Sequence, residues 1–267
     1  MKTETYANGT NLKDNGNDAG CSRHCFALSP APVPVSAGEG SDGEGIGMFC
    51  SVVRAELSVK DIAECLKAVK KVADAENVYI ICLNADCIAG YGHIESAVFH
   101  AKRSWYEDKP IANSFEMEVL LYTGARRQCN EIGEFGLHKG NNDLFVCVCG
   151  EMKNKTEDKN GKVTECRAEN CDERYAEYCE KNEKVFSELE REIGLKLKNG
   201  DGSGNSDDSD DRYDRDNRDN RDEKISDKKL KKLMKLFDIP DEELSEVGIG
   251  RIEELIVEKV ALLDIQK

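Results

Sequence analysis

The segment from Lys109 to Gln128 has residue types that can hold an anion or a nucleic-acid base, arranged around one apolar helical stretch. Asn113 and Ser114 stand at the start of this predicted helix, where free backbone N–H groups favour an anion. A second polar group, from Arg126 to Gln128, follows at the next break in the helical pattern. The two clusters could hold a phosphate or an unstacked base. Helix capping and a pair of solvated arginines explain the same residues without a ligand.

Two histidines are the next residues whose spacing could support chemistry. His93 and His100 are seven residues apart in a helical segment, so their side chains share one face. Because no acidic or cysteine side chain stands at a matching spacing on that face, we expect structural histidines; ligand recognition and catalysis stay open as alternatives. Asp86 follows a predicted buried strand, where α/β enzymes often place a carboxylate. Capping of the next turn explains Asp86 equally well.

The 12 cysteines do not form a metal-binding pattern. There is no Cys-x-x-Cys pair, the spacing typical of zinc sites. We therefore expect buried, reduced cysteines that pack as small apolar side chains, and only the trio of Cys166, Cys171 and Cys179 merits a metal assay. The sequence also contains no phosphate-binding loop, dinucleotide-binding pattern, nucleophile elbow or His-Glu-x-x-His motif. These observations predict a protein without catalytic activity, cofactor or metal.

Composition divides the 267 residues into four parts. Residues 1–47 and 199–224 carry too few apolar side chains to offset the entropy of ordering, so we expect a disordered leader and a disordered acidic tether. Residues 48–198 form the expected core, with an insertion near 150–170. Residues 225–267 are expected to form helices that pack on the core or on a partner protein.

The formal net charge of −15 argues against a nucleic-acid partner, but affinity depends on the local patch and not on the total. The basic residues near the apolar helices of the expected core are Lys102, Arg103, Lys109, Arg126 and Arg127. No run of about 18 apolar residues and no signal-peptide pattern is present. We expect a cytoplasmic protein without a membrane partner.

Strand-like and helical segments alternate through the expected core. Strands are predicted at 49–57, 77–83 and 144–149; helices are predicted after a Ser58 cap, along 94–105, and at 115–122, 127–135 and 171–193. Gly136 is expected to end the 127–135 helix. The tail adds helices at 227–237 and 251–263. This order predicts an α/β fold, a small mixed sheet packed with helices, with a C-terminal helical tail.

The last predicted helix is apolar around more than half of its circumference. A helix lying on a single core needs only one apolar stripe, so a second surface must cover this one. That surface belongs either to the same domain or to another protein, and the sequence leaves both open.

Three stretches carry a resemblance to a known family: NADCIAGYGHIESAVFHA at 84–101, IANSFEMEVLLYTGARRQCNEIGEFGL at 111–137 and EELIVEKVALLD at 253–264. The chain resembles the small regulatory (TPRKB-type) subunit of the archaeal and eukaryotic KEOPS complex. The resemblance implies an α/β fold without catalytic activity. It also implies a complex that places a threonylcarbamoyl group on the adenosine just 3′ of the anticodon in ANN-decoding tRNAs. By the same resemblance, a different, metal-dependent transferase subunit is expected to carry the chemistry and to meet this chain only indirectly.

The same resemblance implies two partners, the 3′ CCA end of the tRNA and the N-terminal lobe of the small kinase/ATPase. The expected tRNA contacts are His93, Asn113, Ser114, Arg126, Arg127 and Gln128. The expected kinase contacts are Leu255, Ile256, Val260 and Leu263 of the last helix. The RNA would be held as a single strand, through hydrogen bonds and stacking. The acidic balance also allows a kinase regulator with no tRNA contact of its own.

The chain departs from the family pattern in its long leader, its insertion and its acidic tether. The break TGARRQ also places its glycine further from the first arginine than is common in the family. The tether could lengthen the reach of the tail or repel competing RNA, and the sequence does not distinguish the two.

Overall fold

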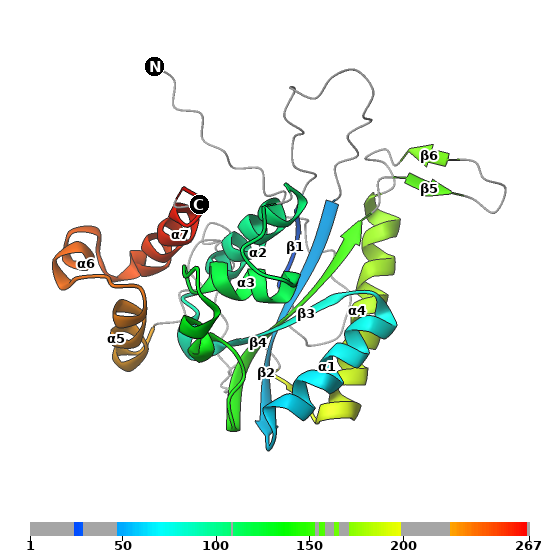
Figure 1. Cartoon of the computed structure of the whole chain (residues 1–267), viewed down its shortest axis with the longest axis horizontal. Helices are drawn as coiled ribbons and strands as arrows, with labels where there is room; N and C mark the ends of the chain where they lie inside the picture. The colour runs from blue at the N-terminus through cyan, green and yellow to red at the C-terminus, as the bar shows by residue number, and fades with distance from the viewer. Residues whose placement is uncertain are drawn as a thin grey trace, which may run out of the picture.

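The computed structural model describes residues 24–28, 47–107, 109–152, 155–157, 163–165, 171–198 and 225–265. It confirms an α/β fold with a five-stranded sheet packed by helices and a C-terminal helical tail (Figure 1). The strands of this sheet are β1 (His24–Leu28), β2 (Gly47–Val59), β3 (Tyr79–Asn84), β4 (Gly140–Met152) and β7 (Lys196–Leu197). They lie in the order β1-β2-β4-β3, with β7 also beside β2, and each of these pairings is antiparallel.

The long pair of β2 and β4 forms the centre of the sheet. Their register runs from Gly47 opposite Met152 to Val59 opposite Gly140. Both strands are covered on two faces, which explains why their central residues are apolar without a clean polar alternation.

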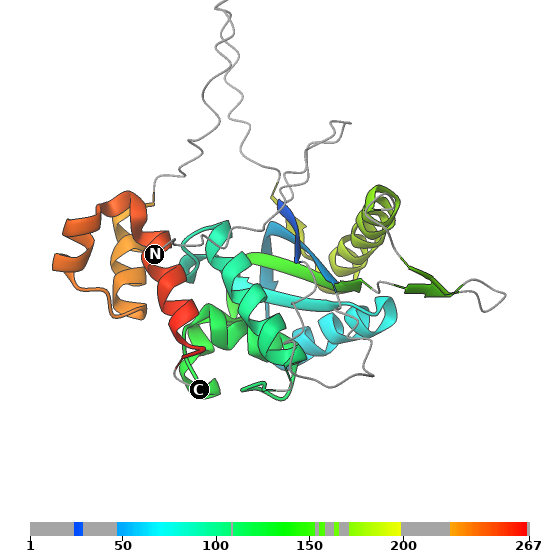
Figure 2. The ribbon, with the colours of Figure 1, turned by 90° about the horizontal axis from the view of Figure 1, so that it is seen from above.

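Helices cover both faces of the sheet (Figure 2). On one face, α2 (Tyr91–Tyr106) and α3 (Phe115–Thr123) pack over a cluster that includes Val52, Ile81 and Cys147. On the other face lie α1 (Ile62–Glu76) and α4 (Cys171–Ile193), with side chains such as Val72 and Phe186 against the sheet. The predicted tRNA-contact segment therefore belongs to the α2–α3 layer.

The tail consists of α5 (Asp227–Leu236), α6 (Asp241–Val247) and α7 (Ile252–Leu262). The first half of α7 packs, through Leu255 and Ile256, into a cluster with α5, α6 and the end of α3. Its second half packs, through Val260 and Leu263, against α2 and α3. Two different surfaces of the same chain thus cover the wide apolar face of this helix.

The leader, which was expected to be disordered, and the insertion in the core both contain strands. Residues 24–28 of the leader form β1, because Phe26 and Leu28 pack against the α2–α3 layer and the strand pairs with β2. The insertion contains a two-stranded hairpin, β5 (Lys155–Glu157) with β6 (Val163–Glu165). The rest of the leader and the whole of 199–224 lie outside the described residues.

Several local predictions also need correction. Strand β2 continues to Val59, and Asp61, not Ser58, caps α1 by accepting the N–H of Glu64 at 3.0 Å. Residues 127–135 form two short 3₁₀ turns, Cys129–Glu131 and Gly133–Phe135, instead of one helix. Gly136, with φ −99°, is extended and does not end a helix in the left-handed region. Helix α6 lies between the two predicted tail helices, where a helix start at Pro240 and a break at Gly248 were expected but no separate helix was delimited.

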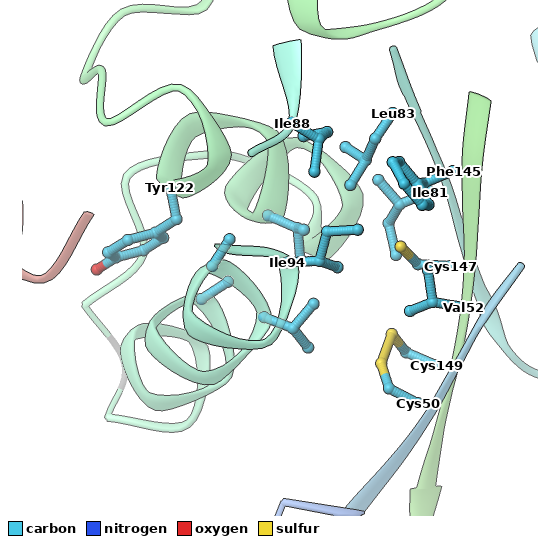
Figure 3. Close-up of a cluster of buried hydrophobic side chains, with 14 of the residues drawn as sticks. Cys50, Val52, Ile81, Leu83, Ile88, Ile94, Tyr122, Phe145, Cys147 and Cys149 are labelled. Carbon is cyan, nitrogen blue, oxygen red and sulfur yellow. A yellow bond between two sulfur atoms is a disulfide. The ribbon is translucent and has the colours of Figure 1, made fainter. Parts of the chain in front are cut away.

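The cysteines depart from the reduced state expected for all of them. Cys50 and Cys149 are register partners on β2 and β4, 4.4 Å apart between Cα atoms, and form a disulfide (Figure 3). Cys82 and Cys147 are buried thiols, and burial raises the pKa of Cys82 to about 12. Of the trio proposed for a metal assay, Cys166 and the side chain of Cys171 lie outside the described residues. Within the described part of the chain, no three His, Cys, Asp or Glu side chains group to hold a metal.

Candidate nucleic-acid interface

His93 lies inside the protein, where it joins the start of α2 to the end of α3. Its side chain is fully buried; Nδ1 accepts the N–H of Ala89 at 3.3 Å, and Nε2 therefore carries the proton and donates to the carbonyl of Thr123 at 2.9 Å. Burial lowers the pKa of His93 to about 4, so the ring is neutral at physiological pH. This burial corrects the expectation that His93 contacts tRNA and agrees with the structural alternative.

A carboxylate from the tail already occupies the N-terminus of helix α2. Gly90 provides no capping side chain, and Glu253 of α7 accepts the N–H of His93 at 3.0 Å instead. A Cβ atom on Gly90 would lie 2.5 Å from the Glu253 carboxylate, and one on Gly92 would lie 2.9 Å from it. The two glycines of this stretch therefore leave room for the tail, and the anion favoured by the helix start is internal.

The start of α3 is occupied in a similar way. Ser114 caps the helix by accepting the N–H of Met117 at 3.3 Å. The fully buried Glu118 accepts the N–H groups of Ile111 and Ala112, at 2.9 and 2.7 Å, and the hydroxyl of Ser104 at 2.7 Å. Asn113 and Ser114 are exposed, but the anion that this turn attracts is the carboxylate of Glu118.

The far end of α3 presents the second predicted cluster. The helix ends with Ala125 in the left-handed region at φ +48°, the conformation that usually requires glycine. Arg126 donates to the carbonyl of Leu236, at 2.7 Å, and to Asp238, at 3.1 Å; Arg127 and Gln128 are exposed. Nine helical residues, about 13 Å of helix axis, separate this cluster from Asn113 and Ser114. The structure does not bring the two clusters together.

Arg126 instead lines a cavity of about 260 Å³, which we call the Arg126 cavity. Its walls are Gly124–Arg126 at the end of α3, Leu236–Asp238 at the end of α5, and Lys259, Leu262 and Leu263 of α7. Leu236, Phe237, Leu262 and Leu263 contribute apolar wall, and the charged residues of the lining are Arg126, Asp238 and Lys259. This combination suits a planar apolar group that carries an anion.

Lys259 is the member of the Arg126 cavity that sequence reasoning missed. A signal was present, because it is the only basic residue within the apolar run from Leu255 to Leu263. Its proximity to Arg126, however, depends on the docking of α7.

The four predicted kinase contacts lie in the interior of this chain. Leu255, Ile256, Val260 and Leu263 are at most 8% exposed, which corrects the expectation that they form a partner surface. The outward apolar residues at this end are Leu262, 42% exposed, and Ile265, 78% exposed.

Asp264 anchors the end of the tail between α2 and α3. Its carboxylate accepts a hydrogen bond from His100 Nδ1 at 2.6 Å, and further hydrogen bonds from Arg103 and from the hydroxyl of Tyr122. Burial alone would raise the pKa of Asp264, but these donors together hold it below the ordinary value. Figure 3 places Tyr122 on the side of the helices away from the sheet.

The basic stretch predicted on α2 is used internally as well. Lys102 is buried and donates to the carbonyl of Leu28 at 3.1 Å, and burial lowers its pKa to about 8. Arg103 binds Asp264. Lys102 therefore holds β1 in place, and Arg103 holds the tail.

In comparisons with known proteins, no family model and no curated protein matches the chain. Among the described residues, no helix combines the length and the apolar character needed to span a membrane.

Proposed function

We propose that this chain is a non-catalytic subunit of a KEOPS-type complex for threonylcarbamoyl-adenosine modification of ANN-decoding tRNAs. In this role it binds the 3′ CCA end of the tRNA and the small kinase/ATPase of the complex. The observation that carries the proposal is the Arg126 cavity, to which the longest resembling stretch contributes Gly124–Arg126 and the resembling terminal stretch contributes Lys259, Leu262 and Leu263.

The chemistry of the Arg126 cavity suits a terminal nucleotide. Leu236, Phe237 and Leu262 provide apolar wall for a base, while Arg126 and Lys259 provide cations for a phosphate. The exposed Arg127 and Gln128 follow directly in the chain and add polar groups beside the cavity. Single-stranded RNA ends are bound by such combinations of apolar wall, charge and hydrogen bonds.

The exposed apolar residues of the tail support the proposed kinase contact. Leu262 and Ile265 are large, outward apolar side chains close to the Asp264 anchor, where a partner protein can cover them. A kinase regulator without a tRNA contact of its own would use this same surface and leave the Arg126 cavity without RNA.

A gel-shift titration with one ANN-decoding tRNA tests the tRNA contact. Intact tRNA and tRNA lacking its CCA end are compared at about 50 and 150 mM salt. Binding that requires the CCA end supports the proposal, and Lys259→Gln should weaken it about tenfold because one charged contact to phosphate is lost. Lys67→Gln, an exposed lysine on the opposite layer, is the matched control and should bind as the wild type does.

Other outcomes of the same titration point elsewhere. Equal binding of intact and trimmed tRNA would refute recognition of the 3′ end. Absence of binding at both salt concentrations would favour the kinase regulator. A pull-down with the small kinase then tests that contact, which Ile265→Glu should weaken.

A further inference from the structure

Helix α5 is strongly amphipathic, with a buried apolar side and a basic outer side. Leu230, Leu233 and the following Phe237 point into the tail cluster. Lys228, Lys231 and Lys235 are exposed at spacings of three and four residues, so they form one stripe, which we call the α5 lysine row. The row extends over about 10 Å of helix axis.

The charge of α5 is opposite to that of the whole chain. Its ten residues contain five lysines and one aspartate, whereas the formal net charge of the protein is −15. In the part of the chain that the structure describes, no ion pair neutralises Lys228, Lys231 or Lys235, although the acidic α6 follows α5 closely. A stripe of three exposed lysines in an acidic protein is a local site for a polyanion.

The α5 lysine row leads to the Arg126 cavity. Lys235 directly precedes Leu236, a residue that lines the cavity and whose carbonyl accepts a hydrogen bond from Arg126 at 2.7 Å. An RNA strand whose end occupied the cavity could therefore continue along α5, where its phosphates would meet the lysines of the row.

We propose that the α5 lysine row binds the phosphate backbone of the RNA strand whose end occupies the Arg126 cavity. The inference rests on the proposed function and adds to it a second, sequence-independent contact. Lysines act as point charges toward phosphate, so the row supplies affinity and salt dependence but no base specificity.

The burial of the apolar side of α5 favours RNA over a membrane surface as the occupant. A helix that binds a lipid surface inserts an exposed apolar face, and in α5 that face is covered by the tail cluster. The proximity of the row to the cationic cavity also matches a ligand that carries several phosphates along one strand.

The test compares two triple variants of the full chain. One replaces Lys228, Lys231 and Lys235 with Gln; the matched control replaces the exposed Lys60, Lys67 and Lys70, on or beside α1 in the opposite layer, in the same way. Binding of intact and CCA-trimmed tRNA is measured between about 50 and 200 mM salt.

Removal of three phosphate contacts should reduce the slope of log K against log salt by about 2. The wild type and the control should then lose about 20-fold more affinity over this salt range than the row variant. The row variant should still distinguish intact from trimmed tRNA, because the Arg126 cavity is unchanged.

Three outcomes would overturn the inference. If the row variant keeps the salt slope of the wild type and still requires the CCA end, the row is not an RNA contact and the proposed function stands. If the wild type binds no tRNA, both proposals fail. If it instead binds vesicles with about one third anionic lipid through the row, a membrane surface is the occupant.

Discussion

The free energy of unfolding of the wild type should fall on mild acidification because of His93, and replacement of His93 with Gln should abolish this fall. The folded-state pKa of His93, about 4, lies below the ordinary value of 6.5. Between these two pH values the unfolded chain binds a proton at this residue and the folded chain does not. The free energy of unfolding therefore falls as the pH drops below about 6.5.

The size of the effect follows from the depth of the shift. A pH of 5 lies about 1.5 units below the ordinary pKa of histidine, and each unit corresponds to about 1.4 kcal/mol. Between pH 7.5 and pH 5, His93 should therefore lower the free energy of unfolding of the wild type by about 2 kcal/mol. Gln offers one acceptor for Ala89 and one donor for Thr123 but does not titrate. At pH 7.5 the variant should be about 1 kcal/mol less stable than the wild type, through imperfect hydrogen bonds.

Urea unfolding followed by circular dichroism at about pH 7.5, 6.5 and 5 measures this difference. The gap between the variant and the wild type should change by about 2 kcal/mol over the series, in favour of the variant in acid. His138→Gln, at an exposed histidine, is the control and should stay parallel to the wild type. Parallel curves for His93→Gln and wild type would refute the buried, neutral histidine.

Three further substitutions test the contacts that position the site, each by urea unfolding. Ala125→Gly should stabilise the protein by about 1 kcal/mol, because φ +48° strains alanine and not glycine; a loss of stability would contradict this. Glu118→Gln should cost about 1 kcal/mol, because a neutral amide oxygen accepts the N–H groups of Ile111 and Ala112 more weakly than a carboxylate does, and a neutral result would mean that the charge of Glu118 is not needed. Asp264→Asn should cost about 2 kcal/mol at pH 7 by weakening the anchor of the tail. Since the pKa of Asp264 is held below its ordinary value of 3.8, that difference should shrink only as the pH falls below that value, and a difference that is unchanged at about pH 2 would argue against the anchor.

Local periodicity predicted most of the elements because it reflects burial of one helix face or of a whole strand. Helix α4 has the predicted bounds, Cys171–Ile193, and the unbroken apolar runs became β3 and β4. The two 3₁₀ turns and β1 were not predicted, because short segments depend on contacts made elsewhere in the chain.

The candidate site was less predictable, because its polar residues are paired over long separations. The His93 backbone meets Glu253 and His100 meets Asp264, across 160 and 164 residues. Sequence spacing identified such residues as candidates for a ligand but could not reveal that the tail already supplies their partners. The same reasoning showed that α7 needs a second surface and could not say which one.

Photo-crosslinking tests the central claim most directly. A tRNA with a photoreactive nucleotide at its 3′ terminus is bound to the full chain and irradiated, and the attached peptides are identified by mass spectrometry. The account predicts crosslinks to Gly124–Arg126, Leu236–Asp238 and the α7 segment around Lys259, which excess unlabelled intact tRNA should abolish and excess trimmed tRNA should not. Crosslinks confined to α1 and α4, on the opposite layer of the sheet, would contradict it.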